Sequence, residues 1–171
     1  DDLARALSRQ FKQIVESAWY RKVFPELDFN KMTEGEIGTT QGGFRYATSV
    51  GGTLTGRGAD FIMVDDPIKP EDAYSDKARA GVNDWYRSTL LSRLDDKQRS
   101  VLTIVMQRLH VNDLTGHVQA RGGFETISFP AIAKKDEQIA LRNGLWHLRR
   151  AGEALQPERE SLEVLNSLRE Q

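Results

Sequence analysis

The chain has 171 residues, enough for one well-buried domain and too few for two domains of typical size. Its 39% hydrophobic and 29% charged residues indicate an ordinary globular protein, and its net charge of -1 excludes a uniformly basic coat for nucleic acid. Without cysteine it holds no disulfide and no cysteine-ligated metal, and without a long apolar run we expect a cytoplasmic protein that does not enter membranes.

The first third of the chain predicts one helix and two strands. Residues 1–20 carry apolar side chains at helical spacing, whereas residues 24–43 are polar and rich in Gly and Thr, which indicates a loop with at most one short strand. Residues 44–50 alternate and predict a strand. A glycine loop, residues 51–60, then leads into the apolar run 61–64, which we expect to be a buried strand.

The rest of the chain continues this alternation. Ser75 is predicted to cap a helix that runs to about Leu94, and residues 101–106 form the most apolar run, expected to be an interior strand. The remaining expectations are a helix over 110–120, a strand before Pro130 within 124–132, a connection over 133–152 and a capped helix from Ser161. Strands that alternate with helices predict an α/β sheet covered on both faces.

Two adjacent carboxylates, Asp65 and Asp66, follow directly after the apolar run 61–64. In nucleotide hydrolases with a phosphate loop, such a strand ends in an acid that holds magnesium, and the next acid polarises the attacking water. The acids would then emerge at the sheet edge where ligands of open α/β sheets bind. The alternative is structural, because Asp before Pro67 is also typical of a simple turn.

The glycine loop GGTLTGRG only partly matches a phosphate loop. Arg57 stands where the pattern requires lysine, and Gly58 stands where it requires Ser or Thr. The loop also leads into a strand, whereas a phosphate loop opens a helix. No Gly-Lys-Ser/Thr occurs in the sequence, so we reject a phosphate loop here. Two interpretations of Arg57 remain: a side chain presented near the carboxylates, or a solvated residue in a plain turn.

Two further groups have a functional and a structural interpretation. His110, Asp113 and His117 fall at positions i, i+3 and i+7, a spacing that could ligate zinc or iron on one helical face. A capping Asp and a packed His are the favoured interpretation, because a glycine interrupts that helix. Trp85 and Tyr86 could stack on bases, but on an amphipathic helix they are expected to belong to the core.

Several segments in this order resemble the large terminase subunits of tailed bacteriophages, the ATP-driven motors that pack DNA into capsids. The segments are GGTLTGRGADFIMVDDPIKPEDAYS (51–75), NDWYRSTLLSRL (83–94), VLTIVMQRLHVNDLTGH (101–117), FPAIA (129–133) and GEALQPER (152–159). Together they span most of the chain. The resemblance favours the catalytic interpretation of Asp65 and Asp66 over the turn.

The resemblance implies part of a P-loop NTPase-type three-layer sandwich with a mostly parallel central sheet. Residues 1–132 would be the later part of the terminase ATPase domain, with the Walker B strand and the coupling motif. The phosphate loop of the family lies upstream of the segment resembled here, so we expect a piece of a longer chain. Residues 133–171 would lead toward a C-terminal nuclease domain of RNase H type that is absent from this chain.

Four residues match functional positions of that family. Asp65 matches the acid that coordinates magnesium, and Asp66 stands where many relatives have the catalytic glutamate, with a shorter side chain. Gln107 matches the polar residue of the coupling motif, which senses the γ-phosphate, although many relatives have Thr there and Trp in place of Leu109. Arg57 lies where some members place an arginine that reaches the nucleotide of a neighbouring subunit.

The expected parent protein hydrolyses ATP with Mg²⁺ in the host bacterial cytoplasm, during infection or from a prophage. It would work as a homo-oligomeric ring on the portal of a procapsid, with double-stranded DNA and a small terminase subunit as partners, while the missing nuclease domain cuts the DNA. The piece itself is expected to be inactive. The alternatives are a fragment of another P-loop ATPase, such as a helicase-like enzyme, and a non-catalytic binding module.

Overall fold

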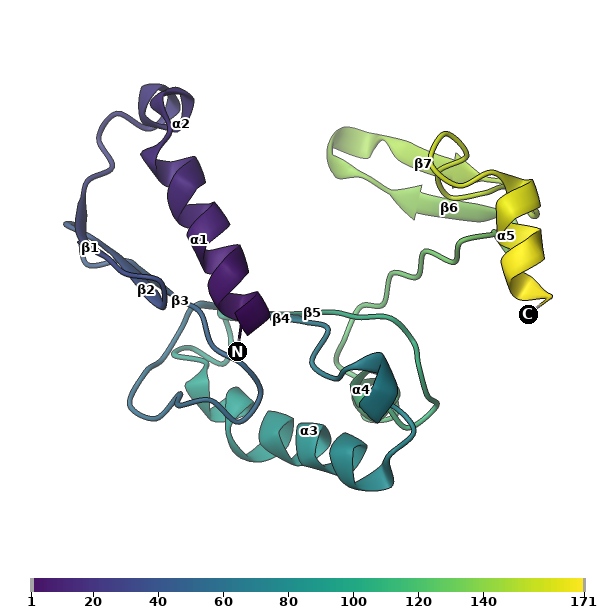
Figure 1. The fold of residues 1–171 in the computed structure, drawn as a ribbon, viewed down its shortest axis with the longest axis horizontal. Coiled ribbons are helices and arrows are strands. Elements are labelled where there is room, and N and C mark those ends of the chain that lie inside the picture. The colour runs from purple at the N-terminus through teal and green to yellow at the C-terminus, as the bar shows by residue number, and fades with distance from the viewer. Residues whose placement is uncertain (1, 171) are drawn as a thin grey trace. The chain divides into compact units, whose positions relative to one another are not determined.

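The computed structural model describes residues 2–170, which divide into two compact units, residues 2–123 and 124–170 (Figure 1). The chain is a mixed α/β protein with small sheets, and one strand pair is parallel. Among the described residues, no helix combines the length and the apolar character that crossing a membrane requires.

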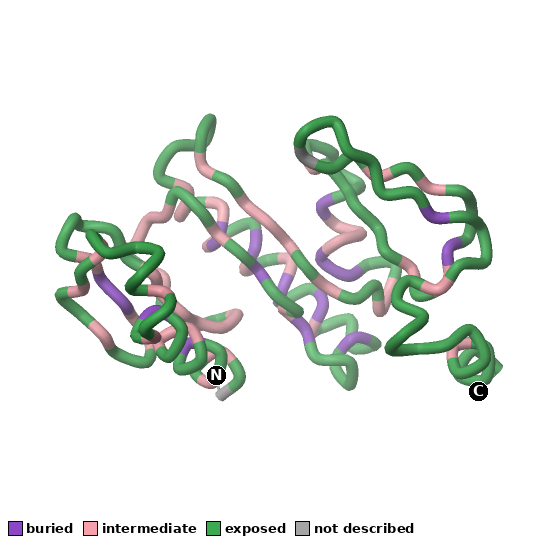
Figure 2. Tube along the Cα trace, turned by 90° about the horizontal axis from the view of Figure 1, so that it is seen from above, coloured by how far each residue is buried: buried purple, intermediate pink, exposed green. Residues whose placement is uncertain are grey.

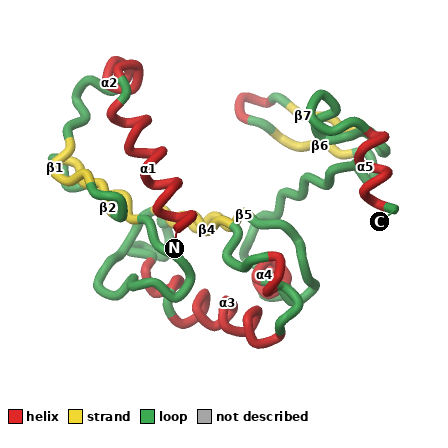
Figure 3. The backbone as a smooth tube through the Cα atoms, in the orientation of Figure 1, coloured by secondary structure: helices red, strands yellow, loops and turns green. Residues whose placement is uncertain are grey.

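Both units contain helices and strands (Figure 3). The first unit holds α1 (Asp2–Glu16), α2 (Ala18–Val23), β1 (Phe29–Met32), β2 (Glu36–Thr39), β3 (Phe44–Tyr46), β4 (Phe61–Asp65), the 3₁₀ turn η1 (Pro70–Asp72), α3 (Asp76–Ser88), the 3₁₀ turn η2 (Leu90–Arg93), β5 (Val101–Val105) and α4 (Leu114–Gln119). The second holds β6 (Glu137–Ala140), the 3₁₀ turn η3 (Arg142–Gly144), β7 (Trp146–Arg149) and α5 (Leu162–Arg169).

Strands β1, β2 and β3 form an antiparallel sheet in that order. The prediction that residues 24–43 form a loop with at most one strand was therefore wrong, because polar side chains on the exposed positions hid two short strands around a buried Ile37. Arg45 of β3 connects this sheet to α1. Its Nη1 donates to the Oγ of the buried Ser8 at 2.9 Å, and its guanidinium lies 4.6 Å from the centroid of the Phe11 ring.

Strands β4 and β5 form the parallel pair, and the chain crosses between them through α3. Parallel strands need such a crossover because the chain must return to the end of the sheet where the first strand began. Val64 of β4 is buried, as are Val82, Tyr86 and Leu90 from α3 and the turn after it. The predicted strands 61–64 and 101–106 are thus confirmed as strands, each within one residue of its expected end.

Exposed residues alternate with less exposed ones along β4, and β5 begins and ends with an exposed residue (burial is coloured along the chain in Figure 2). Phe61 and Met63 on β4 are 56% and 61% exposed, and Val101 and Val105 on β5 are exposed as well. The prediction of two buried apolar strands in a sheet covered on both faces was therefore wrong for the described residues. Alternation explains the result, because successive side chains of a strand point to opposite faces, and only one face meets α3.

The helix termini follow their capping residues. The Oγ of Ser75 accepts from the N–H of Ala78 and begins α3 where predicted, although α3 ends at Ser88 and only the 3₁₀ turn η2 continues toward Leu94. The Oγ of Ser161 likewise accepts from Val164 and begins α5, as predicted.

The second unit contains a hairpin that the sequence prediction missed. Residues 133–152 were expected to be a connection, but β6 and β7 pair as antiparallel strands there. Asn143 and Gly144 in the loop have φ angles of 63° and 72°, a conformation that favours Asn-Gly between paired strands. The prediction of a strand within 124–132 was wrong, because that stretch contributes only an isolated bridge at Ile132.

Candidate functional site

The predicted acids lie at the carboxyl edge of the β4–β5 pair. Asp65 is level with Val105 in the parallel register, and the N–H of Asp66 donates to the carbonyl of Val105 at 3.0 Å. The strands therefore end together, and the residues that follow each strand lie close in space although about forty positions separate them. This edge is where open α/β sheets bind their ligands.

Asp66 joins the two chain segments at this edge. Its Oδ1 accepts a hydrogen bond from the backbone N–H of Gln107 at 3.2 Å. Its φ angle of 39° lies in the left-handed region, which Asp tolerates better than most residues. The structure thus brings two predicted site residues, Asp66 and Gln107, into direct contact.

Asp65 has a different environment. It is the last residue of β4, its side chain is exposed, and within residues 2–170 it forms no side-chain hydrogen bond or ion pair. An exposed carboxylate next to a second one supplies the hard oxygen ligands that Mg²⁺ prefers. Asp65 and the Oδ2 oxygen of Asp66 are therefore the groups at this edge with the chemistry to hold a divalent cation.

Beyond Gln107, the chain forms a network around the buried carboxylate of Asp113. Its Oδ1 accepts from the N–H of Gly116 at 2.9 Å and caps α4. Its Oδ2 accepts from the N–H of His110 at 3.3 Å and from Nε of Arg108 at 3.1 Å. Nη1 of Arg108 also donates to Oε1 of Gln119 at 3.0 Å, so the guanidinium has two fixed partners.

Sequence reasoning missed Arg108. The available signal was its place directly after Gln107 and five residues before a helix-capping Asp. That signal is weak without the structure, because a contact between Arg108 and Gln119 depends on how the chain turns between them.

The structure gives His110, Asp113 and His117 separate structural partners. Asp113 caps α4, as the favoured interpretation predicted. Nδ1 of His110 accepts from the N–H of Asn112 at 3.0 Å, while the ring of His117 lies edge-on to Tyr86 and contacts Arg121. Burial, followed by the nearby positive charge, lowers the pKa of His117 below its ordinary value. Across the described range 2–170, no three His, Asp or Glu side chains converge on a common point.

The glycine loop before β4 is occupied by a packing contact. Gly58 lies so close to Asp95 that a Cβ atom there would approach its Oδ1 to 1.6 Å. The N–H of Ala59 donates to the carbonyl of Arg93 at 2.8 Å, and the N–H of Asp95 returns a bond to Ala59 at 3.2 Å. This close packing against Asp95 explains the glycine at position 58, and a phosphate-binding role is not required to explain it.

Arg57 lies away from the predicted acids. Its Nη2 forms an ion pair with Oε2 of Glu36 at 2.9 Å, and its guanidinium lies 4.3 Å from the centroid of the Tyr46 ring. Lys31 also contacts Glu36 at 2.8 Å. These contacts attach Arg57 to β2 and β3 on the amino-terminal side of β4, so the expectation that it faces Asp65 and Asp66 within one chain is not met.

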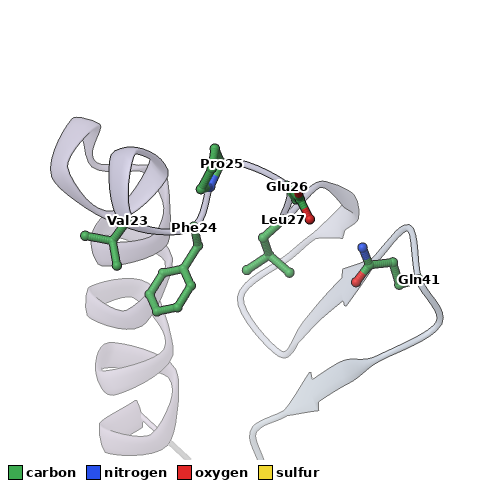
Figure 4. A pocket seen from close by; sticks show the side chains of 6 residues that line it. All are labelled: Val23, Phe24, Pro25, Glu26, Leu27 and Gln41. Carbon is green, nitrogen blue, oxygen red and sulfur yellow. The ribbon is translucent and has the colours of Figure 1, made fainter.

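A shallow hollow of about 410 Å³ lies elsewhere in the first unit, between the end of α2 and the sheet (Figure 4). Its wall is formed by Val23, Phe24, Pro25, Glu26, Leu27 and Gln41. These side chains include a single acid and no base, so the hollow has apolar contact surface but no arrangement for acid–base or metal chemistry.

The Asp113 network predicts the effect of Asp113→Asn. Asparagine can still cap α4 through Oδ1, but its amide nitrogen cannot accept from Arg108 or His110. We expect a loss of about 2 kcal/mol in the free energy of unfolding, measured by urea denaturation. Asp84→Asn is the matched control, because Asp84 forms an exposed pair with Arg87 and should change stability by less than about 0.5 kcal/mol. Equal effects of the two substitutions would contradict a central role for Asp113.

The ion pairs of Glu36 with Arg57 and Lys31, here called the Glu36 cluster, predict that stability depends on pH. The hydrogen bond from Arg57, followed by that from Lys31, lowers the pKa of Glu36 from 4.5 to about 2. Because the folded pKa is lowered, the stabilising contribution is complete above the unfolded value of 4.5 and is lost as the pH falls toward 2.

We expect Arg57→Gln to raise the pKa of Glu36 more than Lys31→Gln does, as measured by carboxyl ¹³C chemical shifts during an NMR titration. A Glu36 that titrates near its ordinary value in the unsubstituted protein would show that the cluster does not form in solution.

Comparison with protein-family models, curated proteins and solved structures found no match to this chain. Function is therefore inferred from the site geometry together with the sequence motifs. The feature that bears on it most directly is the edge where Asp65, Asp66 and Gln107 meet.

Proposed function

We propose that residues 1–171 supply the magnesium-binding and coupling part of an ATP-hydrolysing DNA-packaging motor of the terminase large-subunit type. The observation that supports this most is the hydrogen bond between Asp66 and the backbone of Gln107 across the ends of the parallel strands β4 and β5. The resemblance to terminase segments would make these the Walker B and coupling strands. Because the two strand ends are hydrogen-bonded to each other, a shift of Asp66 on nucleotide hydrolysis would move Gln107 as well.

The three residues at this edge would have different roles in ATP hydrolysis. Asp65, exposed and without a side-chain partner in the described range, would hold Mg²⁺, which would neutralise charge on the nucleotide phosphates. Asp66 keeps Oδ2 to orient and polarise a water, while its Oδ1 is bound to Gln107. Gln107 would then report the presence or loss of the terminal phosphate, because its backbone is attached to the same carboxylate.

The proposal places the phosphate loop outside residues 1–171, since the sequence has no Gly-Lys-Ser/Thr. In a three-layer P-loop sandwich, a central parallel sheet is covered on both faces. The open face of the β4–β5 pair, with Phe61 and Met63 exposed, has the apolar character of a surface that another layer would cover. This supports a further covering layer on the sheet in the complete motor.

Within that motor, Arg57 would act on the nucleotide of a neighbouring subunit in a ring, because its contacts direct it away from Asp65. The partners proposed with it are double-stranded DNA, the portal of a procapsid and a small terminase subunit, with residues 133–171 leading to a nuclease domain. A helicase-like ATPase would share the same edge. Packaging of DNA into procapsids, measured on the complete gene product, separates the two.

The metal site can be tested on this chain with Mn²⁺, a paramagnetic cation that also binds carboxylates. We expect Mn²⁺ to broaden the backbone NMR signals of residues 65–67 and 105–107, and Asp65→Asn to remove most of the effect. Asp60→Asn is the matched control, because it removes an exposed carboxylate beside the amino end of the same strand. Broadening that survives Asp65→Asn and is lost in Asp60→Asn would place the metal at the wrong end of β4.

ATP turnover by this chain is a second outcome of the same proposal. Without a phosphate loop, residues 1–171 alone should hydrolyse no ATP above the buffer rate in a phosphate-release assay. Measured turnover that Asp65→Ala abolishes would overturn the placement of the phosphate loop outside this segment.

A further inference from the structure

We propose that Arg108 binds an oxygen of a magnesium-bound phosphate at the carboxyl edge of β4 and β5, and that Asp113 and Gln119 hold it there. The inference rests on the proposed function, since it uses the same metal edge. It adds a binding residue, Arg108, and two positioning residues that the sequence motifs did not assign.

The guanidinium of Arg108 has two fixed partners, and its Nη2 lies near Gly116 of α4. Nε donates to Asp113 and Nη1 donates to Gln119, which uses two of the five N–H donors of the group. The side chain is nevertheless 45% exposed, whereas that of Asp113 is 0% exposed. A guanidinium already held in place loses little further freedom when it binds an anion, and its planar fork suits phosphate oxygens.

Asp113 is a rigid support for this arginine. Its carboxylate is buried and accepts from two backbone N–H groups, those of His110 and Gly116, besides Arg108. Both backbone donors belong to the turn that leads into α4 or to α4 itself. The position of the guanidinium is therefore tied to the backbone at two points.

Other arginines of this chain show what a purely structural role looks like. Arg79 and Arg149 are buried, and each donates to backbone carbonyl oxygens: Arg79 to Ala73 at 2.6 Å, and Arg149 to Pro130 at 2.9 Å. Arg108 instead leaves nearly half of its side chain accessible.

The neighbouring charges decide which anion fits. Arg108 directly follows Gln107, whose N–H is bound by Asp66, and Asp65 ends the adjacent strand. These two carboxylates repel a bare phosphate. A phosphate that carries Mg²⁺ complements both the negative and the positive groups, because the cation binds the carboxylates and a free phosphate oxygen binds the guanidinium. The chemical class is thus a metal-bound polyphosphate, such as that of a nucleotide, rather than the phosphate backbone of DNA.

The experiment is an NMR titration of the 171-residue chain with magnesium pyrophosphate, followed through the backbone amides of Gln107 and Leu109. We expect saturable shifts, and Arg108→Gln should weaken the apparent affinity about tenfold or more. Arg108→Lys keeps the charge but loses the fork, so its affinity should lie between the two. The matched control, Arg99→Gln, removes an exposed arginine near the amino end of β5 and should leave the affinity unchanged.

A positioning role for Gln119 is tested by Gln119→Ala, which should weaken binding by a smaller factor than Arg108→Gln while the amide signals of α4 keep their dispersion.

Shifts that Arg108→Gln leaves unaltered would overturn the proposal. If Mn²⁺ still broadens residues 65–67 in that experiment, the metal site stands. Arg108-dependent shifts that need no Mg²⁺, with no Mn²⁺ broadening at Asp65, would overturn both the metal site and the magnesium-bound class of ligand. Duplex DNA that shifts the same amides without Mg²⁺, in an Arg108-dependent manner, would overturn the choice of a polyphosphate.

Discussion

The parallel pairing of β4 with β5 is the constraint on which the candidate site depends. It sets Asp65 level with Val105, and so places the residues after both strands at one edge. The chain crosses between the two strands through α3, which contributes the buried Val82 and Tyr86. A change that loosens the packing of these buried residues would separate the carboxylates from Gln107 without altering any of the three side chains. Core and site are therefore energetically linked here.

The two adjacent carboxylates have unequal roles because their backbones differ. Asp65 ends a regular strand and keeps its side chain exposed, whereas Asp66 turns into the left-handed region and bonds to Gln107. The short side chain at position 66 suits this contact, since the carboxylate oxygen must stay close to its own backbone to reach the neighbouring strand end. A glutamate would carry its carboxylate one methylene further out. Aspartate at position 66 thus has a local physical reason.

Local signals in the sequence predicted local structure well. Ser75 and Ser161 located two helix starts, and the apolar runs located β4 and β5, because caps and apolar runs act within a few residues. The hairpin around Asn143 was also within reach of the sequence, since Asn-Gly favours its turn. Two features lay beyond local signals: which face of β4 stays exposed, and the contact of Arg108 with Asp113. Both depend on how distant or intervening segments fold back.

The two arginines considered for nucleotide contact are held in different ways, and the difference sets where each can act. Arg108 is bound to the fully buried carboxylate of Asp113, which cannot move with it. Arg108 can therefore bind a ligand only at its present position. Arg57 is 37% exposed and is paired with Glu36 at the surface of β2. That partner is only 17% exposed, and the Tyr46 ring lies 4.3 Å from the Arg57 guanidinium. To reach a neighbouring subunit, Arg57 would therefore have to give up the bond that contributes most to holding the pKa of Glu36 at about 2.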